Sequence, residues 1–212
     1  MKTNERISSL VDELEPVRPV NTARTAALSW IFALGATAVC MLLVAPFRTG
    51  FVEQLLSTPR FALETVVGLV VGILFVRAAF ELAVPDRRSQ RLYVTLAAVL
   101  GAFWLALFAF AFIEPALPPS MAGKRHECYY EAMAISLPMT VIAIFMLRRM
   151  YVLNGVRTGL FAGIAAGVLP AFLMQLACMH EPWHTITHHV APIGVSAVAG
   201  AVLGAWLLRR RQ

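Results

Sequence analysis

Long apolar segments alternate with short polar segments along most of the chain. Six apolar blocks stand out, at residues 25–46, 61–84, 92–113, 129–147, 156–177 and 190–208. Each block is long enough to cross a hydrocarbon core of about 30 Å as an α-helix. A helix is expected because an open strand would leave backbone groups unpaired in lipid. The pattern predicts an all-α membrane protein, a bundle of about six transmembrane helices with short connections.

The composition agrees with this prediction and adds an orientation. Only 14% of the residues are charged, whereas a soluble domain carries about a quarter. Thirteen lysines and arginines lie before the first block, after the last block or beside the second and fourth connections, and four lie on the other side. Because cytoplasmic loops are the basic ones, both termini are expected in the cytoplasm. The basic residues are therefore expected to face lipid headgroups, with no direct contact to nucleic acid.

Three regions follow from this division of the chain: a cytoplasmic N-terminal tail at 1–24, the bundle at 25–208, and a basic cytoplasmic C-terminus at 209–212. Within the tail, four apolar residues have the i, i+3, i+4, i+7 spacing of one helical face: Ile7, Leu10, Val11 and Leu14. Such a short helix cannot bury its own apolar face. Two interpretations are open, namely a helix lying on the membrane surface and a helix that docks in a partner's groove.

The negative charge of the tail favours docking in a partner's groove over lying on the membrane surface. Helices that lie on membranes usually carry lysine and arginine on their polar face, but Asp12, Glu13 and Glu15 make this face acidic. The residues expected to bind a basic partner are Ile7, Leu10, Val11, Asp12 and Leu14.

Small residues recur every fourth position along two of the blocks. Gly155, Gly159, Gly163 and Gly167 form one row, and Ser196, Gly200 and Gly204 form another. Rows of this kind allow two membrane helices to approach closely.

Few charges lie within the spans. Arg77 and Glu81 are four residues apart near the end of the second block, where they can pair or reach the membrane interface. Glu64 lies at the opposite mouth of the same block. Ionisable residues at mid-depth, which a pump would need, are missing from the predicted spans.

Cysteines and histidines gather on the non-cytoplasmic side of the predicted bundle. Cys128 and Cys178 lie at neighbouring ends of the fourth and fifth blocks, which should place them at one membrane depth. Three interpretations are open: a disulfide, a site for a soft or borderline transition-metal ion, or packed cysteines beside histidines in a wet loop. No cofactor is certain, and the candidate metal ligands besides the two cysteines are His126, His180, His184 and His188.

Three stretches of the chain form a recognisable set: the tail "ISSLVDELEPVRPV", the fourth block with "ECYYEAMAISLPMTVIAIFMLRR", and the fifth with "GVRTGLFAGIAAGVLPAFLMQLACMHEP". Together they resemble the NrsF-like family of six-span bacterial anti-sigma factors. The resemblance implies a bacterial inner-membrane protein whose tail holds an extracytoplasmic-function sigma factor away from RNA polymerase. It also implies that Cys128 and Cys178, which match the family's cysteine pair, sense heavy metal or oxidative stress. The family is expected to have aromatic residues where this chain has "HTITHH".

The expected function is therefore regulation and not catalysis. The alternatives are a small membrane transporter or metal-handling protein, and a membrane redox enzyme that uses the cysteine pair. Acidic residues at mid-membrane would favour the transporter, and a Cys-x-x-Cys motif would favour the redox enzyme. The sequence contains neither.

Overall fold

The computed structural model describes residues 3–12, 23–44, 47–85, 89–121, 123–125 and 127–208. Leu14, His126 and the C-terminal segment 209–212 lie outside the described residues, as does the side chain of Leu10. What the sequence predicts for them stays a prediction.

The described residues form helices and no strands. The elements are α1 (Thr3–Asp12), α2 (Ala23–Val44), α3 (Phe51–Ser57), α4 (Pro59–Glu81), α5 (Ser89–Phe110), α6 (Cys128–Leu147), α7 (Gly155–Ala177), α8 (Pro182–His184), the π-helical segment η1 (Thr185–Val190) and α9 (Ala191–Leu207). The last three follow one another without a break, as one helical stretch from Pro182 to Leu207.

The prediction of an all-α membrane protein is confirmed, and the number of spans is confirmed in part. Among the described residues, five helical stretches are long and apolar enough to cross a membrane: α4, α5, α6, α7 and Pro182–Leu207. Helix α2 has 22 residues but is not one of these five. The last span was expected to start at residue 190, and this boundary is wrong, because the helix already begins at Pro182.

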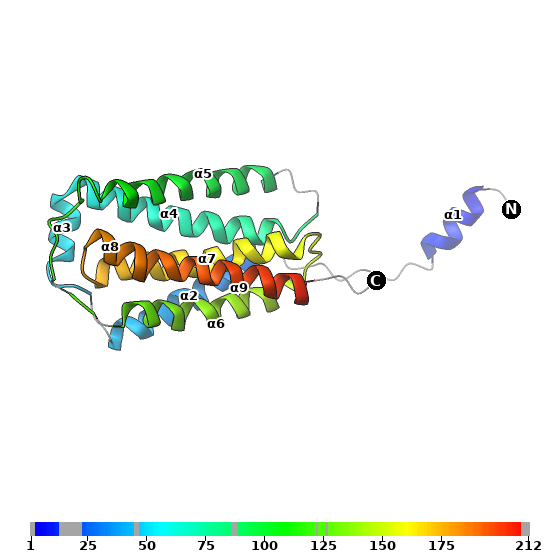
Figure 1. The fold of residues 1–212 in the computed structure, drawn as a ribbon. Helices are drawn as coiled ribbons and strands as arrows, with labels where there is room; N and C mark the ends of the chain where they lie inside the picture. The colour runs from blue at the N-terminus through cyan, green and yellow to red at the C-terminus, as the bar shows by residue number, and fades with distance from the viewer. Residues whose placement is uncertain are drawn as a thin grey trace.

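Helix α7 is the centre of the bundle. It packs against α9, α4 and α6, while α5 packs on α4 and α2 packs on α4 and α6. Figure 1 shows these helices side by side along one axis, with α3 and α8 at one end and the end of α9 at the other. The largest buried side chains in this core include Trp30, Trp104 and Ile144.

The two rows of small residues face each other between α7 and α9, which confirms the predicted close approach. A Cβ atom added to Gly163 would meet the carbonyl oxygen of Ser196 and lie 2.7 Å from its carbonyl carbon. Gly159 faces the backbone of Gly200 in the same way. Backbones this close leave no room for any side chain, so this interface depends on glycine.

The charged pair at the end of α4 behaves differently from the prediction. Arg77 Nη2 lies 2.6 Å from Glu81 Oε1, which confirms the pairing. The expectation that both side chains reach the membrane interface is wrong for Glu81, which is fully buried. The hydroxyl of Ser89, the first residue of α5, donates a hydrogen bond of 2.9 Å to this carboxylate. The buried carboxylate therefore links the two ends of the α4–α5 connection.

Candidate functional site

The two cysteines meet where α6 begins and α7 ends. Cys128 is the first residue of α6, and Cys178 caps the C-terminus of α7. Their Cα atoms are 7.1 Å apart, their sulfur atoms lie at disulfide distance, and both side chains are fully buried. The prediction that they lie within reach of each other is confirmed. We call this end of the molecule, which also carries α3 and α8, the cysteine end (Figure 1).

The histidine segment that follows is helical, so it is not the loop of the third interpretation. Pro182 occupies the first turn of α8, a position that needs no backbone N–H donor. The Glu181 carboxylate caps this turn by accepting hydrogen bonds from the N–H groups of Trp183 (3.0 Å) and His184 (2.6 Å). The helix then widens into η1, a π-helix. Three histidines therefore lie inside the last candidate span: His184, His188 and His189.

Two of these histidines face the cysteines. His184 Nε2 lies 3.2 Å from Cys178 Sγ. The sulfur atoms of Cys128 and Cys178 and one ring nitrogen each from His184 and His189 all lie within 4.8 Å of one another. We call these four residues the Cys/His cluster. Two thiol groups and two imidazoles are the donor types that zinc prefers in proteins.

His189 has no hydrogen-bond partner. Its side chain is 2% exposed, and neither ring nitrogen has a partner among the described residues. A buried polar group left in this state costs about 1–3 kcal/mol. Such a group calls for an explanation by function or by a ligand.

The structure includes one of the predicted histidine ligands in the cluster and excludes two. His184 belongs to it, whereas the His188 ring stacks on His184 at 4.2 Å between centroids and its Nδ1 lies 2.7 Å from Thr187 Oγ1. His180 lies instead against α4, with its ring edge-on to Phe61. His189 was not among the predicted ligands, because its place in the cluster depends on the π-helix.

A second polar group lies buried beside the cluster, around Glu64. This carboxylate is fully buried in α4, where Arg60 Nε lies 3.3 Å away and Gln175 Nε2 donates to it at 3.4 Å. His180 Nε2 lies 3.9 Å from it. Burial, together with the positive charges of Arg48 and Arg60, lowers the pKa of His180 to about 4. His180 is therefore neutral at neutral pH, and its contact with Glu64 is not an ion pair.

Arg48 connects the cysteine to a different part of the fold. Its guanidinium is nearly buried and donates from Nη1 to the carbonyl oxygen of Cys178 at 2.9 Å. From Nη2 it donates to Gln54 Oε1 at 2.6 Å. Since Gln54 belongs to α3, one side chain joins α3 to the end of α7. The sequence shows Arg48 only as one of the few basic residues on this side.

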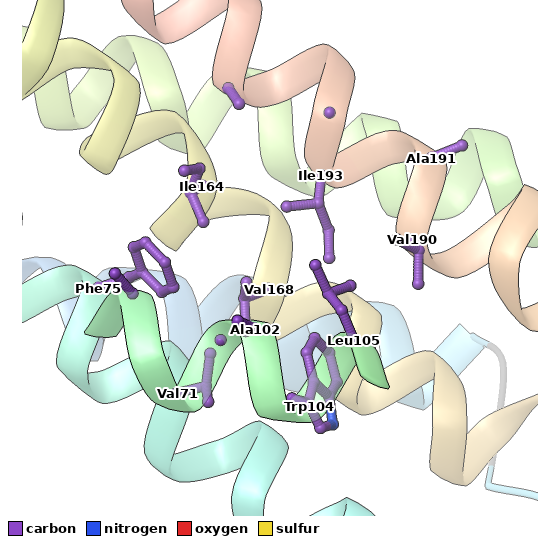
Figure 2. A pocket seen from close by; sticks show the side chains of 14 residues that line it. Val71, Phe75, Ala102, Trp104, Leu105, Ile164, Val168, Val190, Ala191 and Ile193 are labelled. Carbon is purple, nitrogen blue, oxygen red and sulfur yellow. The ribbon is translucent and has the colours of Figure 1, made fainter. Parts of the chain in front are cut away.

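An apolar cavity of about 570 Å³ lies further along the bundle, between α5 and the α7–α9 pair. Figure 2 shows Phe75, Trp104, Leu105 and Ile193 around it. Its lining residues include no cysteine, histidine or charged side chain. The cavity is therefore separate from the Cys/His cluster.

The described apolar side chains of α1 are exposed. Ile7 and Val11 are 55% and 57% exposed, and Asp12 is exposed as well. Figure 1 shows α1 apart from the bundle. The helix predicted for the tail therefore exists over Thr3–Asp12, and the described part of its apolar stripe is not covered.

The comparisons with known proteins decide the family. Residues 10–209 match the NrsF family model, described as negative regulator of sigma F. The chain belongs to this family. It is also 32% identical over 181 residues to the carotenogenesis protein CarR of Myxococcus xanthus, an alignment that covers 84% of this chain and 75% of CarR. No solved structure matches. Family membership and the five apolar helices identify a membrane regulator of the anti-sigma type and not an enzyme.

Proposed function

We propose that this chain holds an extracytoplasmic-function sigma factor through residues 1–24 and releases it when Cys128 and Cys178 meet a metal or oxidative signal. The observation that carries the proposal is membership of the family of negative regulators of sigma F over nearly the whole chain. The kind of sigma factor, the segment that binds it and the signal are the parts we add.

The proposed setting is the bacterial inner membrane, with α2 as a sixth span and both termini in the cytoplasm. Helix α2 is as long as α5, and its residue Arg24 lines the same surface groove as Arg77 and Tyr93, from the end of α4 and the start of α5. An even number of spans brings both termini to one side. That side is proposed to be the cytoplasm, because thirteen lysines and arginines flank it and only four flank the other side.

The tail is the proposed holding element. Its apolar stripe is exposed in the described residues Ile7 and Val11, and a stripe of this spacing fits a hydrophobic groove of a partner. Asp12 and its acidic neighbours favour a groove with a basic rim. A short helix of this kind gains its stability from the partner that covers it.

The cysteine pair is the proposed sensing element. Cys128 and Cys178 tie α6 to α7, and α7 packs on α9 and α4. A disulfide typically stabilises by about 2–4 kcal/mol, and a switch from 1:99 to 99:1 needs about 5.5 kcal/mol. Forming or breaking this tie therefore supplies a large part of the energy that a two-state bundle requires.

The tail is tested by introducing negative charge into its apolar stripe. Leu10→Asp with Leu14→Asp removes two apolar anchors of about 1.5–3 kcal/mol each if they are buried in the partner. The double variant should no longer retain the sigma factor when the tagged full-length protein is purified from membranes. The matched control is Ser8→Asp with Ser9→Asp, which adds the same charge away from the stripe and should retain it. Equal retention by both variants would show that the stripe is not the binding face.

The cysteines are tested in cells that carry a reporter for the sigma factor. With Cys128→Ser and Cys178→Ser, exposure to cadmium or a thiol oxidant should leave the reporter silent. Cys40→Ser, at the third cysteine of the chain, should induce normally. Full induction in the double variant would mean that the pair only packs the bundle.

A further inference from the structure

We propose that Cys128, Cys178, His184 and His189 together bind one zinc-like divalent ion when both cysteines are in the thiol form. The inference deepens the proposed function, since it names the ligands and the class of ion that act at the cysteine pair. It rests on the proposed function for its regulatory consequence, and on the geometry of the Cys/His cluster for the site itself.

The four donor atoms are already close enough together for one ion to reach them all after small shifts. All four lie within 4.8 Å of one another. In a tetrahedral zinc site, with bonds of about 2.0 Å to nitrogen and 2.3 Å to sulfur, the ligand atoms are roughly 3.3–3.8 Å apart. His184 Nε2 is already 3.2 Å from Cys178 Sγ, no other pair has to close by more than roughly 1–1.5 Å, and the sulfur atoms need to separate from disulfide distance. Both shifts are within the reach of side-chain rotation.

His189 supplies an independent reason to expect a ligand. The ring is buried, and neither nitrogen has a partner within the part of the chain that the structure describes, although a buried imidazole normally has a partner for at least one of them. The ring lies edge-on to His184, at 5.3 Å between centroids, and one of its nitrogens points into the cluster. A metal ion bound there would satisfy that nitrogen.

The π-helix is what brings the two histidines together. His184 and His189 are five residues apart, which in an α-helix would place them about 140° apart around the axis. A π-turn holds more residues than an α-turn, so residues five apart lie closer to one side of the axis, and the N–H of Ala191 indeed bonds to the carbonyl of Ile186, five residues earlier. Turns of this kind inside α-helices are frequent at functional sites. Here the turn places both imidazoles on the side of the cysteines.

Metal binding and the disulfide exclude each other. A thiol gives up its proton when it binds the ion, so two protons are released for each ion bound. A disulfide has no thiolate to offer, so only the reduced pair forms the site. The two states also tie different elements together: the disulfide joins α6 to α7, whereas the ion joins α6, α7, α8 and η1.

The test uses the full-length protein in lipid nanodiscs, reduced and then titrated with Co²⁺ and Zn²⁺. We expect one ion per chain, with the absorption of a tetrahedral thiolate complex for Co²⁺. His189→Gln should weaken binding by more than the roughly 10–100-fold that loss of an outer-shell partner costs. The matched control is His188→Gln, because His188 stacks on His184 without belonging to the cluster; its loss should cost no more than the roughly 10–100-fold of an outer-shell partner. Wild-type affinity in His189→Gln would overturn the proposal.

Two further measurements separate a lost ligand from a misfolded site. If His189→Gln still forms the Cys128–Cys178 disulfide with a mild oxidant, the cysteine end is folded and the loss of metal supports the proposal. If it forms neither, His189→Cys decides, because a thiolate can replace the imidazole: restored binding supports the site, and absent binding overturns it.

The sigma factor is followed separately in the same preparations. The tail variant Leu10→Asp with Leu14→Asp should lose the sigma factor and keep the metal. Wild-type protein that holds the sigma factor but binds no metal would overturn this site alone and leave the proposed function in place.

Discussion

The contact between α7 and α9 allows a sharp prediction about stability. Replacing Gly163 by Ala places a Cβ atom against the backbone of α9, at 2.7 Å from the carbonyl carbon of Ser196 and 2.9 Å from the Cα atom of Ala197. Ordinary contacts of a Cβ atom are longer than 3.4 Å. Both obstacles are backbone atoms, which cannot turn away as a side chain would. The two helices therefore have to separate by roughly 1 Å at this level.

The cost of that separation can be estimated from packing. Overpacking a tight interface typically costs about 1–3 kcal/mol, and a gap of 0.5–1 Å forfeits a quarter to a half of each dispersion contact it opens. The same substitution makes the helix itself more favourable by about 1 kcal/mol. Gly194 in α9 isolates this second effect, because nothing lies within 4 Å of the Cβ atom it would gain. Because both variants gain this helix term, Gly163→Ala should be less stable than Gly194→Ala by the overpacking cost alone, about 1–3 kcal/mol.

The assay is reversible unfolding of the purified protein in detergent micelles, followed by circular dichroism. Gly163→Ala should unfold at a lower denaturant concentration than the wild type, and Gly194→Ala at the same or a higher one. Equal free energies of unfolding, within about 0.5 kcal/mol, would refute the close backbone contact between α7 and α9.

Two other predictions follow from the structure and the charge pattern. Arg48→Gln removes charge-assisted hydrogen bonds to the Cys178 carbonyl and to α3, so it should lower stability by about 1.5–3 kcal/mol; thermal unfolding measures this, with exposed Arg148→Gln as the unaffected control. Topology reporters fused after Arg88, after Arg149 and at Gln212 should report a cytoplasmic location. Reporters fused near Thr58 and near Trp183 should report the opposite side of the membrane. A signal from the opposite side at Gln212 would contradict an even number of spans.

The helices were predictable because transfer into lipid depends on the local sequence. The second block, expected at 61–84, became α4 (Pro59–Glu81), and the fourth, expected at 129–147, became α6 (Cys128–Leu147). The glycine rows were predictable for a related reason, since a repeat of four residues marks one face of a helix whatever its neighbour is. That the glycine row of α7 packs against α9 could be seen only in the structure.

The polar residues were harder to predict, because their surroundings come from distant parts of the chain. Glu64 is buried because Gln175, 111 residues later, and His180 lie against it. The hydropathy pattern starts the last predicted span at residue 190 and so leaves out His189, since histidine counts as polar. Nothing in "HTITHH" indicates that the helix begins before it or that it widens into a π-turn. The proximity of the two cysteines was predictable because they end consecutive helices, so that chain order alone brings them together.

The packing of α7 decides where a change at the cysteines can act. On one side α7 meets α9 through glycines whose backbones already touch, so these two helices cannot shift closer or rotate easily against each other. On the other side it meets α6, with Cys128 and Cys178 at the end of that contact. Helix α6 packs on both α7 and α9. In the proposed mechanism, a bond or an ion at Cys178 would therefore act on the boundary between α6 and the α7–α9 pair, which would respond as one unit.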